Sequence, residues 1–148
     1  MNFLKNMSSS FQGEHFNSAY LINLETWQWT ELAPMSGPRS GMACGKAGTE
    51  IIVTGGDAKQ DSSEIFSLLT GTWRQGPPAP GGDWLYSATS AYVQTANSFR
   101  ILGGYTDHGE RNIYEFDPKR TEWITSDKTL KEDRSRHVVF NIPREFCQ

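Results

Sequence analysis

The feature that most constrains this chain is a recurring pattern of glycine pairs and tryptophans. A run of β-forming residues ends in a glycine pair twice, at Ile51–Gly56 and at Phe99–Gly104, and the second pair lies 48 positions after the first. A tryptophan follows each pair, Trp73 after 17 positions and Trp123 after 19. Repeats of about 20 to 50 residues are typical of folds that stack one small unit several times. The sequence therefore predicts one structural unit that recurs along the chain.

The second half of this pattern occurs a third time, upstream, where Trp29 follows the strand-like run Tyr20–Asn23. The three tryptophans are 44 and 50 positions apart. Residues 1–16 contain no glycine pair, so we expect them to be a poorly ordered leader or the remnant of an incomplete repeat. In every copy an apolar residue precedes the tryptophan by seven positions, and these residues are Ile22, Phe66 and Phe116.

The local pattern within each copy is typical of strands. Short runs rich in Ile, Val, Phe, Tyr and Thr alternate with Gly, Pro, Asn and Asp, and no stretch combines a helical apolar period with helix caps. Four strands in each complete copy match a blade of a β-propeller. We therefore expect an all-β fold with strands at Asn17–Asn23, Trp27–Leu32, Gly41–Gly45, Glu50–Thr54, Ser63–Ser67, Thr72–Gln75, Ser87–Val93, Ser98–Leu102, Asn112–Phe116, Thr121–Thr125 and Arg136–Asn141.

Composition and charge argue against several classes of function. The 148 residues carry a net charge of −3, with no basic surplus for nucleic acid. No apolar run approaches the roughly 18 residues of a membrane-spanning helix, and the first residues do not resemble a secretory signal. Cys44 and Cys147 are 103 positions apart, which suggests free thiols rather than a disulfide framework. We expect a cytoplasmic protein, with the nucleus as the alternative, that binds neither nucleic acid nor membrane.

The repeat resembles the kelch motif of β-propeller proteins. Its clearest copy has Gly103–Gly104, then Tyr114–Pro118 with an aromatic-Asp-Pro ending, and then Trp123 six positions after the Asp. The junction Leu32–Met35, followed by Pro38–Gly41, also matches the family. The Gly-His and Trp-Asp signatures of the other propeller repeat of similar length are absent.

The resemblance covers roughly residues 17–141 and implies an incomplete kelch-type propeller. About two complete four-stranded blades would be flanked by parts of two others. Kelch propellers usually have about six blades, and propellers as a class about four to eight. We therefore expect the C-terminal part of a longer ring, marginally stable or self-associating when alone. The expected division of residues 17–148 is into blade parts 17–35, 36–79 and 80–126 and a closing strand at 136–141.

The resemblance also implies structural roles for the repeated residues. Glycine at a strand end permits a sharp turn and a close backbone approach, and each repeat tryptophan is expected to pack in the core between adjacent blades. The motif is not followed at Ser67–Leu68, which replaces Asp-Pro, or at Trp84, which stands where an Arg is expected. The structural positions are Gly55, Gly56, Gly103, Gly104, Trp29, Trp73, Trp123, Tyr20, Phe66, Tyr114 and Phe116.

Residue patterns typical of catalysis or cofactor binding are absent from the sequence. The three histidines, at positions 15, 108 and 137, lack companions at ligand spacing, so we expect exposed or structural histidines. The glycines at positions 37, 41, 45 and 48 are expected in turns, because Ala47 follows Gly45–Lys46 where a phosphate loop requires Ser or Thr. Some kelch-like propellers are copper oxidases, but no Tyr, His and Cys match their metal site here. The sequence favours a non-enzyme without cofactor or metal.

Kelch proteins bind partners through loops on one propeller face. By this resemblance, we expect the loops after the glycine pairs and the loops between blades to contact a partner. Arg and exposed aromatic residues are enriched at interaction hot spots. Arg39 and Arg136 occupy the motif position from which family members often contact a ligand, although local pairing with carboxylates is an equal alternative. The expected partner-binding residues are Arg39, Ser40, Asp57, Lys59, Asp61, Trp84, Tyr86, Tyr105, His108, Arg111, Arg134 and Arg136.

Three classes of function follow from the resemblance. The first is a protein-interaction module that binds a protein or peptide, as in the substrate receptors of cullin-based ubiquitin ligases. The second is a scaffold of the cytoskeletal, actin-associated type, and the third, which the missing catalytic pattern disfavours, is a propeller-based oxidase. The partner itself could also be the missing blades or a second copy of the chain.

Overall fold

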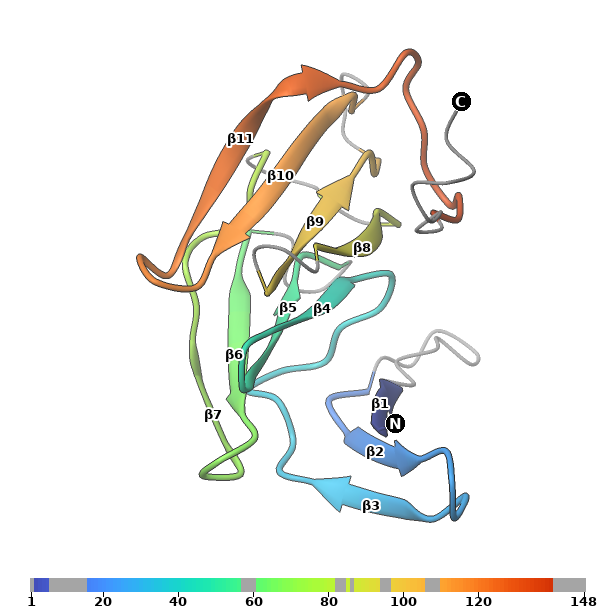
Figure 1. Cartoon of the computed structure of the whole chain (residues 1–148), viewed down its shortest axis with the longest axis vertical. Coiled ribbons are helices and arrows are strands. Elements are labelled where there is room, and N and C mark those ends of the chain that lie inside the picture. Colours follow the sequence, from blue (N-terminus) through green and yellow to red (C-terminus); the bar gives the residue numbers. More distant parts are fainter. Residues whose placement is uncertain are drawn as a thin grey trace.

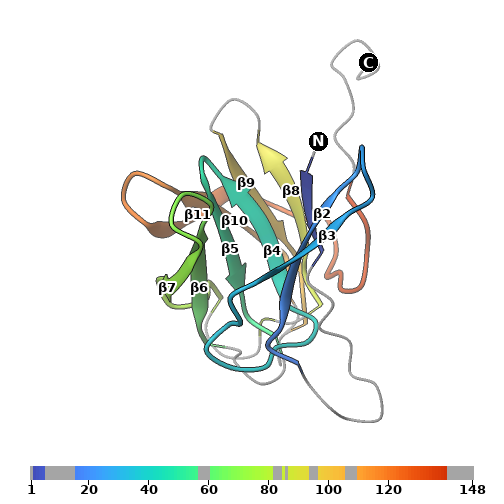
Figure 2. The ribbon, with the colours of Figure 1, turned by 90° about the horizontal axis from the view of Figure 1, so that it is seen from below.

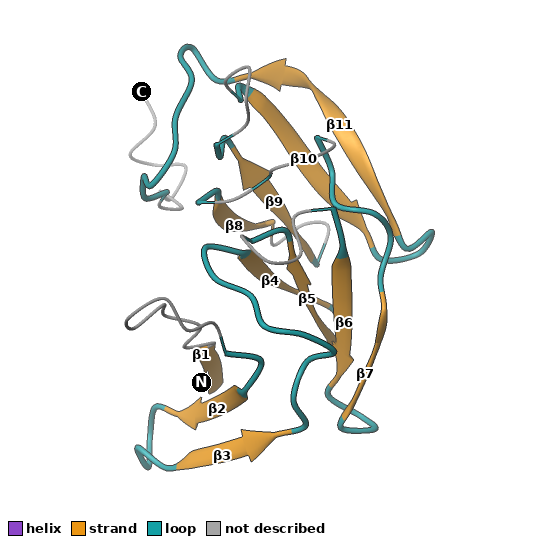
Figure 3. Cartoon of the chain, turned by 180° about the vertical axis from the view of Figure 1, so that it is seen from behind, coloured by secondary structure: helices purple, strands orange, loops and turns teal. Residues whose placement is uncertain are grey.

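The computed structural model describes residues 2–5, 16–56, 61–81, 85, 87–93, 97–105 and 110–139, with the backbone alone described at 2–5 and 91–93. These residues form strands, turns and loops, and Figure 3 shows no helix among them. The expected all-β class is confirmed.

The strands of the described residues form three antiparallel sheets. Sheet 1 has the order β1–β2–β3, with β1 (Asn2–Lys5), β2 (Ala19–Asn23) and β3 (Trp29–Leu32). Sheet 2 has the order β4–β5–β6–β7, with β4 (Ala43–Ala47), β5 (Glu50–Thr54), β6 (Ser63–Ser67) and β7 (Thr72–Gln75). Sheet 3 has the order β8–β9–β10–β11, with β8 (Thr89–Val93), β9 (Ser98–Leu102), β10 (Asn112–Asp117) and β11 (Glu122–Thr129).

The three sheets lie along an arc (Figure 1). Strands β1, β4 and β8 line the inner side of the arc, and β3, β7 and β11 lie on its outside. In the view turned by 90°, β4, β5, β8 and β9 lie at similar inclinations, with neighbouring strands of each sheet antiparallel (Figure 2). This radial arrangement of sheets is compatible with part of a propeller.

The seven-residue spacing before each tryptophan is produced by one hairpin geometry that occurs three times. The apolar residue and the tryptophan are direct cross-strand partners, as Ile22↔Trp29, Phe66↔Trp73 and Phe116↔Trp123. Cross-strand pairs of this kind stabilise a sheet and fix its register.

A polar side chain at the start of each hairpin turn explains why the geometry recurs. Asn23 Oδ1 accepts from the backbone N–H groups of residues 25 and 26, at 2.9 and 3.2 Å. Ser67 Oγ and Asp117 Oδ1 accept from the equivalent pairs of N–H groups in their turns. Asn, Asp and Ser are favoured in turns for this reason. The departure from Asp-Pro at Ser67 is therefore tolerated, because a hydroxyl oxygen can accept the same hydrogen bonds.

The hydrophobic core lies mainly between sheets 2 and 3. Phe99 stacks on Phe116 with ring centroids 6.2 Å apart and meets Trp123 edge-on at 5.5 Å. The same ring covers Gly45, which lies inside β4, and a Cβ there would collide with it. The expectation that Gly45 lies in a turn is wrong: its missing side chain makes room for a ring of the next sheet. The cluster contains Ala43, Ala47, Ile52, Ile65, Leu85, Phe99, Ile101, Tyr114 and Phe116, with Ala88 and Trp123 packed against it.

Two further expectations are corrected. Trp29 is 49% exposed on β3, because no other sheet of the described residues packs against that face. The closing strand expected at 136–141 is not formed over residues 136–139, which are irregular, and 140–141 lie outside the described residues. In the segment 1–16, expected to be a poorly ordered leader or the remnant of an incomplete repeat, residues 2–5 form β1 and pair with β2.

Candidate binding surface

The glycine-pair turns lie against the segments that follow sheets 2 and 3. Gly56 N–H donates to the carbonyl of Leu85 at 3.1 Å, and Gly104 N–H donates to the carbonyl of Arg134 at 2.8 Å. Gly55 and Gly103 have φ values of 70° and 60°. A Cβ at Gly55 would collide with the Leu85 carbonyl, and a Cβ at Gly103 would collide with the Arg134 carbonyl. Glycine is required at these turns by both the backbone conformation and the close approach.

A second series of backbone hydrogen bonds aligns the starts of successive sheets. Ser87 N–H donates to the carbonyl of Gly41 at 2.7 Å, and Arg136 N–H donates to the carbonyl of Ser87 at 2.9 Å. All three residues have positive φ, at 63°, 54° and 53° for Gly41, Ser87 and Arg136. They are therefore structurally equivalent. Two positions before these residues stand Arg39, Leu85 and Arg134, which are therefore also equivalent. The assignment of Trp84 to the motif position of Arg39 is wrong by one residue, and that of Arg136 is wrong by two.

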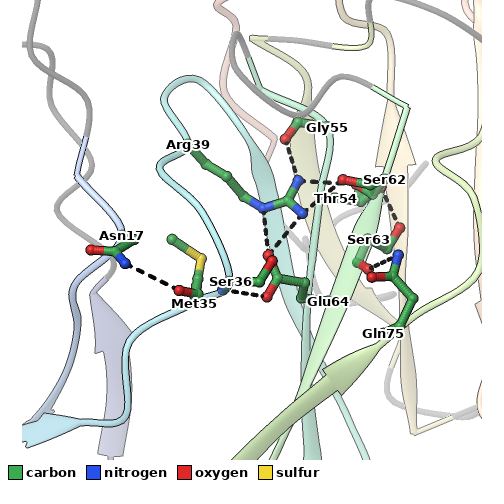
Figure 4. A network of polar contacts seen from close by, with 10 residues as sticks. All are labelled: Asn17, Met35, Ser36, Arg39, Thr54, Gly55, Ser62, Ser63, Glu64 and Gln75. Atoms are coloured by element: carbon green, nitrogen blue, oxygen red, sulfur yellow. Dashed lines mark hydrogen bonds and ion pairs between the residues drawn. The ribbon is translucent and has the colours of Figure 1, made fainter.

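Arg39 is not a surface residue but the centre of a buried network (Figure 4). Its side chain is 1% exposed and pairs with Glu64 of β6, with Nη2 to Oε1 at 2.9 Å. Further bonds reach the carbonyls of Gly55 and Ser62 and the Ser62 hydroxyl, at 2.9, 3.0 and 2.9 Å. The other Glu64 oxygen accepts from Ser36 N–H at 2.7 Å. The expectation that Arg39 contacts a partner is corrected: local pairing with a carboxylate occupies it.

Burial also corrects the expectation for Ser40, which is 6% exposed. In the following sheet the Arg39–Glu64 pair is replaced by Leu85 and Tyr114, which both belong to the hydrophobic core. Tyr114 Oη donates to the buried Glu110 carboxylate at 3.0 Å. Burial is the main cause that raises the pKa of Tyr114 to about 12. These Arg39 and Tyr114 contacts join loop segments to the sheets, so both residues have structural roles.

The exposed part of the predicted surface is a hollow at the end of sheet 3. Ser87, Tyr105, Ser135 and Arg136 line a volume of about 250 Å³. Tyr105 is 48% exposed. The Arg136 side chain is exposed and has no ion pair with any described residue. Together these side chains carry one cationic donor, one aromatic ring and three hydroxyls, which suits recognition of a polar segment of a partner.

Of the other predicted residues, some have local partners and some fall outside the described residues. Arg111 donates to the carbonyl of Leu130 at 3.1 Å, and Arg134 forms an exposed pair with Glu132 at 3.1 Å. Asp61 is exposed, and its carbonyl accepts from Ala79 N–H at 3.0 Å. The residues outside the described part are Asp57, Lys59, Trp84, Tyr86 and His108.

The structural aromatic residues differ in burial. Trp73 is half-buried and packs against Phe66 with ring centroids 5.0 Å apart and ring planes tilted by 55°. Its Nε1 donates to the carbonyl of Ala33 at 2.6 Å, on the segment that leaves sheet 1. Trp123 is half-buried, and its Nε1 has no acceptor among the described residues. Tyr20 is half-buried on β2, opposite Lys5 and Glu31.

Sequence reasoning missed several residues of this region. Ser87 and Ser135 line the hollow, and the offset that relates Gly41 to Ser87 and Arg136 could have identified the first. His137 lies beside Gly103, its two ring nitrogens are buried without a partner among the described residues, and its pKa is lowered by burial and by Arg134. Glu64 and Glu110 are buried acids that no local sequence signal marks.

Within the described residues there is no cluster of three or more His, Cys, Asp or Glu placed to hold a metal ion. A helix of sufficient length and hydrophobicity to span a membrane is also not found in that part of the chain. Cys44 faces a buried environment that raises its pKa to about 12, so its thiol is a poor nucleophile.

No protein-family model matches the sequence, and no curated protein matches it.

Proposed function

We propose that this chain is part of a kelch-type β-propeller and acts as a non-catalytic module that binds a partner protein or peptide. The observation that carries the proposal is the hollow at the end of sheet 3, which the exposed Arg136 and the exposed Tyr105 line together. Loops held on a rigid framework of sheets are a common place for binding sites. Arg and Tyr are also the residue types that contribute most to interfaces when they are buried by a partner.

The three sheets support the propeller part of the proposal. Each repeats the cross-strand pairing of an apolar residue with a tryptophan and the same side-chain-capped hairpin turn, and the four strands of sheets 2 and 3 follow the same order. For such a module the kelch resemblance suggests the role of substrate receptor of a cullin-based ubiquitin ligase, with a cytoskeletal, actin-associated scaffold as the alternative. A cytoplasmic location fits both roles.

Affinity capture from cell extract with the variant Arg136→Gln tests the proposal. The Gln keeps most of the side-chain length but removes the charge, so partners held at the hollow should be lost. Arg120→Gln is the matched control, because Arg120 is an exposed Arg in the β10–β11 turn, at the opposite end of sheet 3 from Gly103 and Gly104. Recovery of a cullin complex or of actin would distinguish the two roles. Equal capture by wild type and both variants would contradict binding at the hollow.

A further inference from the structure

The binding hollow is built in part from a segment that belongs to no sheet of the described residues. Two of its four lining residues lie on residues 134–137, which we call the docking segment. Two backbone hydrogen bonds hold this segment in place: Gly104 N–H donates to the carbonyl of Arg134 at 2.8 Å, and Arg136 N–H donates to the carbonyl of Ser87 at 2.9 Å. The hollow therefore exists only while the docking segment lies against sheet 3.

His137 is enclosed where the docking segment meets the glycine-pair turn. Its Cε1 lies 3.0 Å from the place that a Cβ on Gly103 would take, so the ring packs closely over that glycine. Both ring nitrogens are buried and have no hydrogen-bond partner among the described residues. The residues at the equivalent positions, directly after the aligned positive-φ residues, are the apolar Met42 and Ala88. The ring therefore occupies a place that suits an uncharged side chain, because a buried charge without a partner is costly.

The charged groups nearest to His137 along the chain do not favour a proton on its ring. Arg134 and Arg136 are the other cations of the docking segment, and repulsion from Arg134 opposes protonation. The carboxylates that precede the segment are Glu132 and Asp133, and neither forms an ion pair with His137. Glu132 pairs with Arg134 at 3.1 Å instead.

The elements packed against the docking segment supply no counter-charge either. Within the described residues, the glycine-pair turn is followed by Tyr105 as its one titratable neighbour, and residues 87–90 at the start of sheet 3 carry none. Burial and the charge of Arg134, in that order, lower the pKa of His137 below its ordinary value of about 6.5. The docked segment therefore favours the neutral ring, and a released segment allows the charged one.

We propose that His137 makes the hollow sensitive to acid: protonation of its ring releases the docking segment and takes Ser135 and Arg136 away from Ser87 and Tyr105. The inference rests on the binding function proposed above for the hollow. Docking is complete above about pH 6.5 and weakens as the pH falls from there to the lowered pKa of the docked ring, because the released segment binds more protons in that range. Each pH unit within it changes the ratio of docked to released segment by at most about tenfold.

Nuclear magnetic resonance of the whole chain between about pH 5 and pH 8 tests the release. The His137 ring proton should titrate with a midpoint below about 6.5. The amide signals of Gly104 and Arg136 should move with the same midpoint, because both of their hydrogen bonds are lost on release. The amide signals of Ile52 and Val53 in β5 should stay constant, which distinguishes release of the segment from unfolding of the protein.

Three variants assign the release to His137. His137→Met supplies the side chain found at the equivalent Met42, so the two amide signals should no longer move over this pH range. Arg134→Gln removes the repulsion and should move the midpoint to higher pH. Arg120→Gln, in the β10–β11 turn, is the control and should leave the midpoint unchanged. Amide signals that stay constant while the wild-type ring titrates, or that move equally in His137→Met, would overturn the proposal.

The release and the proposed function can fail independently. If the amide signals stay constant and Arg136-dependent capture from cell extract still occurs at neutral pH, the release is refuted and the binding site stands. If the amide signals move with the ring but Arg136→Gln captures the same proteins as wild type, the release stands and the proposed function is refuted.

Discussion

Removal of the Arg39 guanidinium should be among the most destabilising single changes in this protein. The side chains of Arg39 and Glu64 are 1% and 3% exposed. In Arg39→Met the Glu64 carboxylate keeps the Ser36 N–H at 2.7 Å but loses its cation, and the carbonyls of Gly55 and Ser62 lose a donor. Leaving one partner of a buried ion pair uncompensated costs about 3–5 kcal/mol. We expect a loss of this size in the free energy of unfolding.

Equilibrium unfolding in urea at one fixed chain concentration measures this loss. Arg74→Met is the matched control in the same sheet, because Arg74 pairs with Glu50 at 2.8 Å but its side chain is 47% exposed. An exposed pair contributes about 0–1 kcal/mol. The double variant Arg39→Met/Glu64→Met should recover most of the loss, because the uncharged pair Leu85 and Tyr114 packs in the core at the equivalent place of sheet 3. Equal effects of Arg39→Met and Arg74→Met would refute the reasoning.

Three other substitutions test separate parts of the structure. Gly45→Ala should destabilise the fold by about 1–3 kcal/mol in urea unfolding, because its Cβ collides with the Phe99 ring, and adding Phe99→Leu should restore part of the loss. Tyr114→Phe should cost about 1–3 kcal/mol in the same assay, since it removes a donor from the buried Glu110 carboxylate, and a loss near zero would contradict this. The His137 pKa is lowered in the folded chain, so the unfolded chain binds more protons and stability should fall as pH drops below about 6.5. A pH series of thermal melts should show a smaller fall for His137→Gln, and equal falls would exclude His137 as the cause.

The repeated hairpin could be predicted from the sequence because it depends on short-range interactions. A polar side chain at Asn23, Ser67 or Asp117 caps the turn, and the turn length then sets which residue faces each tryptophan. Four strands, β5, β6, β7 and β9, have the bounds expected from the sequence alone. The role of Gly45 could not be predicted in this way, because it depends on a ring that lies 54 positions later in the chain.

The sequence by itself determined the all-β class, the unit that recurs and the position of its turns. Only the tertiary structure decided which polar residues are buried and which remain available for binding. Arg39–Ser40 and Arg134–Ser135 are the same dipeptide at equivalent positions, yet Arg39 is buried and Arg134 is exposed. The physical reason is that a guanidinium can be buried only where a carboxylate and carbonyl oxygens surround it. Sheet 2 brings Glu64, Gly55 and Ser62 around Arg39, whereas no described sheet follows Arg134.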